Sequence, residues 1–236
     1  MRLPSFLALF LAGGCLTIHA IAAAPAVPDT MAQRTLACTA CHGENGKAGP
    51  DGYYPRLAGK PAGYLYHQLR NFRDGKRHYA PMTGLLDTLS DDYLKDIAAY
   101  FSAQSHPYPP PSQAAGDPAQ NERARTLVQQ GDKNLGVPAC KQCHGAALMG
   151  VQPATPALLG LPGDYINGQL GGWRSGQRQA TTPDCMARIA SRLSLSDISA
   201  LSRWLASQPV PVPSSPAAQR PEPGPDHLAM ECGSTP

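Results

Sequence analysis

The chain has 236 residues, enough for one or two domains of ordinary size. Hydrophobic residues make up 42% and charged residues 16%, so packed cores are expected and a highly charged disordered chain is excluded. The formal net charge of +3 is spread without a basic run, which argues against nucleic acid as the main partner. Glycine and proline are frequent and aromatic residues are only 6%, which favours small domains whose cores are completed by something else.

Residues 1–24 are expected to be a signal peptide. Arg2 is a short basic start, residues 6–18 are mainly apolar, and Ala20-Ile21-Ala22 offers a cleavage point. An alternative is a lipoprotein site at Cys15, which would attach the chain peripherally to a membrane, although the usual leucine three residues earlier is missing. Either route exports the chain, and we expect it in the periplasm. No later stretch reaches the roughly 20 apolar residues of a membrane span.

The motif C-x-x-C-H, typical of covalent c-type haem attachment, occurs twice. Its residues are Cys38, Cys41 and His42 in the first copy and Cys140, Cys143 and His144 in the second. Two thiols three positions apart in a helical turn can form thioethers with the vinyl groups of one porphyrin, and the adjacent histidine then reaches the iron. We therefore predict two covalently attached haem c groups, with the four cysteines as attachment sites and the two histidines as iron ligands.

Zinc binding and a thioredoxin-like redox pair are the alternatives for a C-x-x-C pair. Zinc would need the four thiolates to converge, yet the motifs lie 102 residues apart and each has its own histidine. A thioredoxin motif needs a βαβ context, and the sequence does not alternate strand and helix. Haem attachment is therefore the preferred interpretation.

The motifs belong to a longer internal repeat, which predicts an all-α fold of two tandem cytochrome c domains. Residues 64–75 match residues 165–176, and residues 89–101 match residues 193–205. Each unit spans about 80–90 residues, so a covalently held haem would supply missing apolar mass to its core. The expected division is a first domain at 25–105, a Pro-rich linker at 106–118, a second domain at 119–208 and a Pro-rich tail at 209–236.

Apolar residues recur at helical spacing in each unit, and we interpret their apolar faces as core positions. The expected helical segments of the first unit are 29–37, 63–73 and a helix for which Ser90 is the N-cap. Those of the second unit are 120–130, 164–174 and a helix that starts near Ser196 and Asp197. Three consecutive prolines in the linker favour a stiff polyproline II segment that keeps the domains adjacent.

The repeat also predicts the second axial ligand of each iron. Met82 lies seven residues before Leu89, and Met186 lies seven residues before Leu193, each in a Pro-containing loop ahead of the third helix. A thioether is a soft, neutral ligand that raises the reduction potential of haem iron. With both axial positions filled there is no site for a substrate, so we predict an electron carrier rather than an enzyme.

The other methionines and histidines are not expected to bind iron. Met149 lies too close to its own motif to reach the opposite haem face, and Met31 and Met230 lie outside the repeat. Four histidines have no equivalent in the other copy and are expected at the surface: His67, His78, His106 and His227.

With these motifs in place, the sequence resembles the cytochrome c4 family, which are periplasmic dihaem carriers with two class I cytochrome c domains. The resemblance rests on the two C-x-x-C-H-G units, on Met82 in P-M-T-G-L-L-D-T-L-S and on Met186 in C-M-A-R-I-A-S-R-L-S. Residues 131–140 are also similar, and the resemblance excludes the tail. It implies domains packed about a pseudo-twofold axis with their haem edges facing. Cys185 stands where the family often has another methionine, which leaves Met186 as the candidate.

The sequence and this resemblance predict a periplasmic dihaem cytochrome that passes electrons from a quinol-oxidising complex or a dehydrogenase to a terminal oxidase or another acceptor. One alternative is the dihaem subunit of a dehydrogenase such as a sulfide-oxidising flavocytochrome. Another is a dihaem peroxidase, against which Met186 argues because it fills the open position that a peroxidase needs. A surface without strong charge predicts weak, transient docking on partners.

Two cysteines remain outside the signal peptide and the haem motifs. Cys185 adjoins the predicted ligand Met186, and Cys232 lies in the Pro-rich tail. Leftover thiols in an oxidising periplasm more often pair than persist, so we predict a disulfide between them that ties the tail to the second domain. The alternative is a buried Cys185, with Cys232 disordered or bonded to a partner chain.

Overall fold

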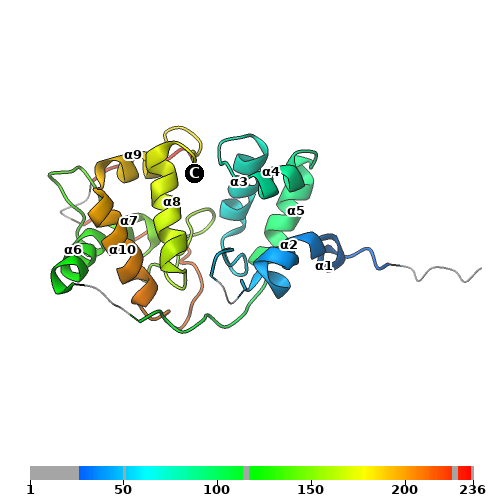
Figure 1. Ribbon diagram of the computed structural model, residues 1–236, viewed down its shortest axis with the longest axis horizontal. Helices are drawn as coiled ribbons and strands as arrows, with labels where there is room; N and C mark the ends of the chain where they lie inside the picture. The colour runs from blue at the N-terminus through cyan, green and yellow to red at the C-terminus, as the bar shows by residue number, and fades with distance from the viewer. Residues whose placement is uncertain (1–26, 50–51, 114–116, 225–227, 235–236) are drawn as a thin grey trace, which may run out of the picture.

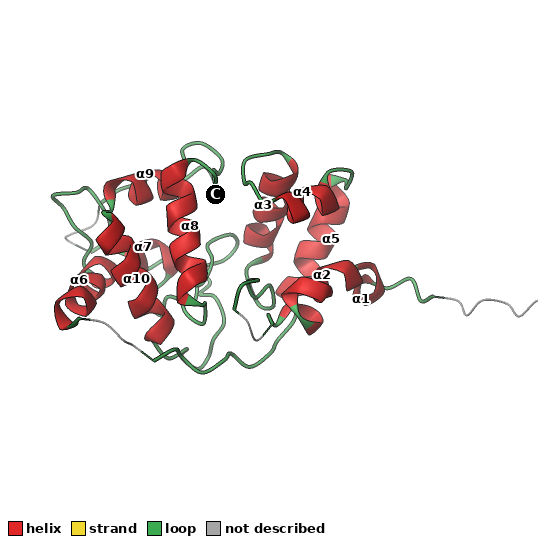
Figure 2. Ribbon diagram, viewed as in Figure 1, coloured by secondary structure: helices red, strands yellow, loops and turns green. Residues whose placement is uncertain are grey.

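The computed structural model describes residues 27–49, 52–113, 117–224 and 228–234, which form two helical domains side by side (Figures 1 and 2). The first domain contains α1 (Met31–Arg34), α2 (Leu36–His42), the 3-10 helix η1 (Glu44–Gly46), α3 (Ala62–Arg73), α4 (Ala80–Leu86) and α5 (Asp91–Ser102). The second contains α6 (Pro118–Gln129), α7 (Cys140–His144), α8 (Gly163–Ser175), α9 (Cys185–Arg192) and α10 (Leu195–Ser207). The described residues make isolated β-bridges but no strand, so the all-α prediction is confirmed. The predicted signal peptide, Cys15 and His227 lie outside the described residues.

The longer predicted helices are present, and the sequence supplies their caps. Ser90 accepts a hydrogen bond from the backbone N–H of Tyr93 at the start of α5, as predicted. At the start of α10 the cap is Ser194, which exchanges hydrogen bonds with Asp197 in a capping box. The segment predicted at 29–37 is divided at Thr35 into α1 and α2.

The two methionines predicted as iron ligands lie in short helices rather than in loops. Met82 is in the first turn of α4, where Pro81 is tolerated because that turn does not need its missing N–H. Met186 is in the first turn of α9, which Asp184 caps by accepting from the N–H of Ala187. The loop prediction was wrong because these helices have only seven and eight residues, too few to show a clear hydrophobic period.

Each domain has its own core between its middle and last helices. In the first domain α3 packs against α5, and in the second α10 packs against both α6 and α8. Leu94 and Ile97 are buried in the first core, and their repeat equivalents Ile198 and Leu201 are buried in the second. The predicted apolar stripes are therefore core positions, as expected.

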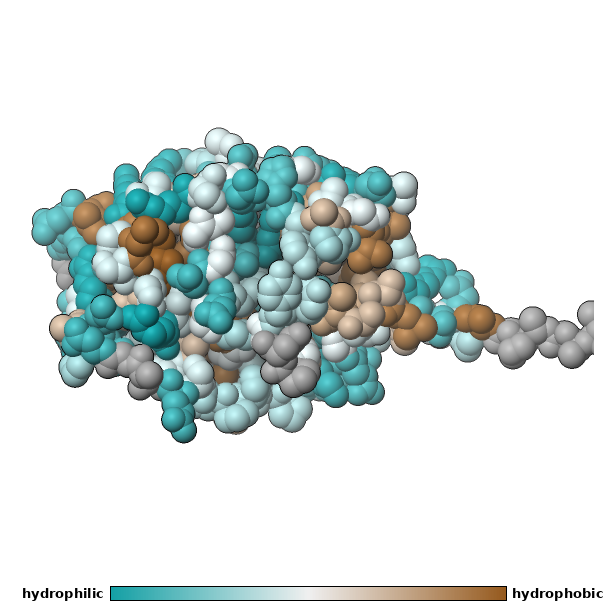
Figure 3. All heavy atoms as spheres, viewed as in Figure 1, coloured by the Kyte–Doolittle hydropathy of each residue, from teal (hydrophilic) through white to brown (hydrophobic). Residues whose placement is uncertain are grey.

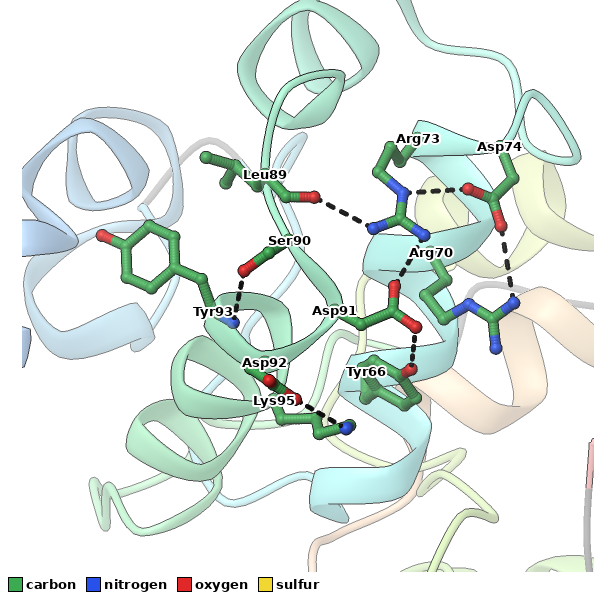
Figure 4. Close-up of polar contacts among 10 residues, drawn as sticks. All are labelled: Tyr66, Arg70, Arg73, Asp74, Leu89, Ser90, Asp91, Asp92, Tyr93 and Lys95. Atoms are coloured by element: carbon green, nitrogen blue, oxygen red, sulfur yellow. Dashed lines mark hydrogen bonds and ion pairs between the residues drawn. The ribbon is translucent and has the colours of Figure 1, made fainter.

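An arginine joins the middle helix to the last helix in each domain. Arg73, at the end of α3, donates to the carbonyl of Leu89 and pairs with Asp91 at the start of α5 at 2.7 Å (Figure 4). Arg174 in α8 donates to the carbonyl of Leu193 at 2.6 Å. The two arginines differ by the same 101 residues as the middle helices, so the repeat preserves a structural contact as well as the core.

The linker is held against both domains. Arg56 of the first domain donates to the carbonyls of residues 106–107, and its guanidinium lies 4.2 Å from the ring centroid of Tyr108. Farther along, the N–H of Ser112 donates to the carbonyl of Ala206 in α10. These contacts fix the linker on the domains that it joins.

The tail crosses the second domain in an extended path. Ala217 forms a single parallel bridge with the loop after the second haem motif: its N–H donates to the carbonyl of Gly150, and its carbonyl accepts from the N–H of Gln152. Near the end, Cys232 is disulfide-bonded to Cys185, with 5.1 Å between their Cα atoms. The predicted disulfide is therefore confirmed.

The described helices are all too short or too polar to cross a lipid bilayer. On the face seen in Figure 3, hydrophilic side chains cover most of the surface, and hydrophobic ones gather in small, separate areas.

Candidate haem sites and the interface between them

The two motif histidines are buried and held in the same way. Nδ1 of His42 lies 2.8 Å from the carbonyl oxygen of Pro55, and Nδ1 of His144 lies 2.7 Å from that of Pro156. A proton on Nδ1 makes this hydrogen bond, so Nε2 remains for a metal. Burial lowers the pKa of both imidazoles, which favours the neutral form that binds iron.

A cavity of about 180 Å³ brings the residues predicted for the second haem together. Cys140, Cys143, His144 and Met186 all line it, and Trp173 is among its other walls. Burial raises the pKa of the Cys140 thiol to about 12, which favours the neutral form of this sulfur. Among the described residues no group of three or more His, Cys, Asp or Glu side chains is arranged to hold a metal ion.

The first domain places its predicted residues equivalently. Cys38 and Met82 pack against the first core, as Cys140 and Met186 pack against the second. His42 is buried, and its ring lies edge-on to Tyr54 with 6.1 Å between centroids. The repeat thus extends from the sequence motif to the packing of the candidate ligands.

A polar cluster that the sequence analysis missed lies between the domains. Its members are Tyr64, Gln68 and Arg77 from the first domain and Tyr165, Gln169 and Arg178 from the second. Each arginine donates to both glutamines and to the tyrosine of the opposite domain. Each residue of the cluster has its repeat equivalent in the other domain, and the equivalent is also in the cluster. The interface cluster therefore has the pseudo-twofold symmetry that the resemblance implied. The sequence did contain a signal for this cluster. Arg77 and Arg178 lie two residues beyond the matching segments 64–75 and 165–176, so they extend the repeat.

The interface cluster carries a surplus of positive charge. Arg178 and the neighbouring Lys60 are only 5% and 7% exposed, and burial lowers the pKa of both. In the described part of the chain no carboxylate forms an ion pair with Arg77, Arg178 or Lys60. Buried cations without a counter-ion are costly, so this site fits anions supplied by a ligand. Haem propionates are such anions, and Lys60 and Arg178 line the same cavity as His144 and Met186.

The remaining histidines and methionines follow the prediction only in part. His78 is exposed and Met149 is buried in the second core, as expected. His67 is half-buried and lines the second cavity, and Nε2 of His106 is buried without a hydrogen-bond partner in the described structure. The surface prediction was wrong for these two because they lie where the domains or the linker meet. Met230 of the tail also lines the cavity.

Comparisons with known proteins decide the family. A protein-family profile described as "Cytochrome C oxidase, cbb3-type, subunit III" matches residues 23–101. Cytochrome c4 of Pseudomonas aeruginosa is 37% identical over 194 residues, which cover 80% of this chain and 94% of that protein. The chain belongs to the cytochrome c4 family. The structure of reduced cytochrome c4 from Pseudomonas stutzeri agrees, with a TM-score of 0.64 and 34% identity over 75% of this chain and 96% of that one.

Other similar proteins bear a second name. The thiosulfate dehydrogenase electron acceptor of Thiomonas intermedia is 38% identical over 200 residues, which cover 84% of this chain and 90% of that protein. The structure of a thiosulfate dehydrogenase from Marichromatium purpuratum matches 73% of this chain with a TM-score of 0.65 and 29% identity, but only 36% of its own length is covered. As a member of the cytochrome c4 family, the chain is a dihaem electron-transfer cytochrome with covalently bound haem c and class I cytochrome c folds.

Proposed function

We propose that this cytochrome is a periplasmic carrier that takes electrons from a dehydrogenase and passes them to a terminal oxidase or another respiratory acceptor. A thiosulfate-oxidising enzyme is the first candidate donor, supported by the 38% identity to a protein named for that role. A quinol-oxidising complex is the second candidate. Membership as a subunit of a larger dehydrogenase, such as a sulfide-oxidising flavocytochrome, would use the same haem sites.

The observation that carries the proposal is the shared cavity of the second domain. Two thiols, an imidazole and a thioether line one space, and the buried cations Lys60 and Arg178 border it. We assign Cys38 and Cys41 to the first haem and Cys140 and Cys143 to the second. His42 and Met82 would bind the first iron, and His144 and Met186 would bind the second.

The bound haem supplies an iron that cycles between the ferric and ferrous states. The chain orients each histidine ring through a proline carbonyl, and the neutral thioethers favour the ferrous state. The buried Arg178 at the cavity adds positive charge that also favours the ferrous state. Because both axial positions are assigned to the protein, the arrangement supports electron transfer over peroxide turnover, which needs an open position.

The axial ligands are tested by replacing each methionine in the holoprotein. The ferric protein should show the weak near-infrared band of methionine-bound haem iron, and Met82→Ala or Met186→Ala should each remove half of it and lower one potential. Met230→Leu is the control, because Met230 lines the same cavity as Met186. A haem count by pyridine haemochrome should give two per chain. Loss of the band in Met230→Leu, with no change in Met186→Ala, would overturn the second ligand.

The donor is tested by rapid mixing of the oxidised holoprotein with each candidate enzyme. We expect reduction by a thiosulfate dehydrogenase in the presence of thiosulfate, because a relative of the chain is named as the acceptor of that enzyme. Omission of thiosulfate is the control. Reduction by a quinol-oxidising complex alone would assign the donor role to that complex.

A further inference from the structure

The two haem motifs differ in what surrounds their second cysteine. Cys41 is exposed, whereas its equivalent Cys143 is half-buried. A pocket beside Cys143 is walled mainly by the tail, through Arg220, Glu222 and Met230 among others. The second cysteine of the motif carries one of the thioethers, so the tail lies against an edge of the second haem.

This part of the tail is fastened at both ends. At its start Ala217 is hydrogen-bonded to the loop after the second motif, and at its end Cys232 is bonded to Cys185. The N–H of Gly233 donates to the carbonyl of Pro183 at 2.9 Å. A Cβ at this glycine would lie 2.3 Å from the carbonyl oxygen of Thr182, so the close approach requires glycine. We call the fastened segment, residues 217–224 and 228–234, the strap.

Between its two attachments the strap places a charge beside the second motif. Arg220 lines the second cavity together with His144 and Cys143, and it also lines the pocket beside Cys143. The strap therefore covers this edge rather than passing at a distance.

The first domain has an open aromatic face at the corresponding place. Tyr53, Tyr54 and Tyr79 gather beside the first motif. The ring centroids of Tyr53 and Tyr54 are 4.9 Å apart, and that of Tyr54 lies 6.1 Å from the ring of His42, the neighbour of Cys41. Hydrogen bonding joins Tyr79 to both of the other tyrosines. Tyr53 is 63% exposed. The nearby charges Glu44 and Lys47 neutralise one another in an ion pair at 3.1 Å.

The second domain lacks this aromatic face. Pro55 and Pro156 make the same contact with their histidines, which fixes the alignment of the two loops. The equivalents of Tyr53 and Tyr54 are then Ala154 and Thr155. Small side chains in the domain that carries the strap, and an exposed Tyr53 with half-buried Tyr54 and Tyr79 in the other, give the two haem edges opposite properties.

We propose that the strap covers the edge of the second haem, so that external redox partners exchange electrons at the first domain, over the face formed by Cys41, Tyr53, Tyr54 and Tyr79. The partner is a redox protein whose docking surface is apolar and weakly charged, because the face it meets is aromatic and its charges are paired. One electron leaves the partner's cofactor and reduces one ferric iron of the chain, and no bond forms or breaks. The second haem then exchanges electrons through the domain interface. This inference rests on the proposed attachment of both haems.

The strap is tested by the accessibility of each haem in the full-length reduced holoprotein. A neutral gadolinium chelate should broaden the haem methyl NMR signals of the first haem several-fold more than those of the second. In the full-length Cys185→Ser/Cys232→Ser variant the second set should broaden to a similar extent, because the strap is released at one end. Equal broadening in the unaltered protein would overturn the strap, while a haem count of two would leave the proposed function intact.

The docking face is tested with matched charge substitutions and ferricyanide as the probe. Tyr53→Glu and Ala218→Glu each add one carboxylate to an exposed position, one beside Cys41 and one on the strap. At low salt Tyr53→Glu should slow oxidation of the reduced protein by about two- to five-fold through repulsion of the anion, and Ala218→Glu should leave the rate unchanged. Both potentials are measured so that the rates are compared at equal driving force. If Ala218→Glu slowed the oxidation, or if neither variant did, the docking face on the first domain would be overturned.

Discussion

Arg178 occupies a site where a charged side chain needs a partner that the described protein does not supply. Its guanidinium lies 3.6 Å from the ring centroid of Trp173 and donates to Gln68 and Gln169. Burial lowers its pKa, and Arg77 nearby adds to the effect. A neutral hydrogen-bonding shell does not offset two adjacent cations, so a propionate beside them would stabilise the cluster.

The redox role of this arginine gives a prediction. Arg178→Met keeps an apolar stem against Trp173 but removes the positive charge. The loss of this charge favours the ferric state of the nearer haem. We expect the reduction potential of one haem to fall by some tens of millivolts, about 1 kcal/mol in free energy, in a spectroelectrochemical titration. Arg125→Met, at an exposed position of α6, should leave both potentials unchanged. A folded Arg178→Met protein with unaltered potentials would show that the cluster does not act on the haems.

The candidate ligands and the interface cluster were not equally predictable. The motif residues and the methionines are local or repeated, so spacing alone places them. Arg77 and Arg178 act only across the contact between domains, which periodicity within one unit does not describe. Lys60 could not be found even from the repeat, because its equivalent is Leu161.

Among the elements, Arg123 of α6 forms an ion pair with α10. Arg123 pairs with Asp197 and with Asp132, each at 2.8 Å. Arg123→Ala should lower the free energy of unfolding of the second domain by about 1–2 kcal/mol in a denaturant titration, because it leaves the largely buried Asp197 without its charged partner. Arg125→Ala on the same helix is the control, since it removes only an exposed pair and should change little. Equal effects of the two variants would contradict the role assigned to the ion pairs of Arg123.

The same contact predicts a pH dependence. Burial would raise the pKa of Asp197, but Arg123 and Ser194 outweigh it, and Arg123 lowers the pKa of Asp132. A carboxyl whose pKa is lower in the folded state stabilises above its unfolded value and loses that contribution as the pH falls. The difference in unfolding free energy between Arg123→Ala and the unaltered protein should therefore shrink below about pH 4. A constant difference down to strongly acid pH would contradict the ion-pair account.

Element length explains which helices were predictable. The middle helices α3 and α8 have 12 and 13 residues, long enough for an apolar stripe to repeat. The helices that carry Met82 and Met186 have seven and eight, and they depend on Pro81 and Asp184 at their starts. The strap has no periodic pattern, and only its cysteine indicated where it is fastened.

At the scale of the whole molecule, the two domains are joined by backbone as well as by side chains. The N–H of Gly63 donates to the carbonyl of Pro153 at 3.1 Å, and the N–H of His78 donates to the carbonyl of Gln177 at 2.9 Å. These bonds flank the interface cluster on helix α3 and on the loop that follows it. A fixed relation between domains suits electron exchange between the two haems, because the separation of the haems then stays constant.

Gly63 allows this relation to be tested. A Cβ there would lie 2.8 Å from the carbonyl oxygen of Pro153, so Gly63→Ala should push the domains apart. We expect it to destabilise the protein by about 1–3 kcal/mol and to slow electron exchange between the haems, measured by NMR line shapes of the half-reduced holoprotein. Gly168→Ala is the matched control: it also lies in a helix, a Cβ there meets nothing within 4 Å, and helix propensity should stabilise it by up to about 1 kcal/mol. If both variants gained stability and exchanged electrons at the unaltered rate, the backbone contacts would not set the domain separation, and the side chains of the interface cluster would have to hold it alone.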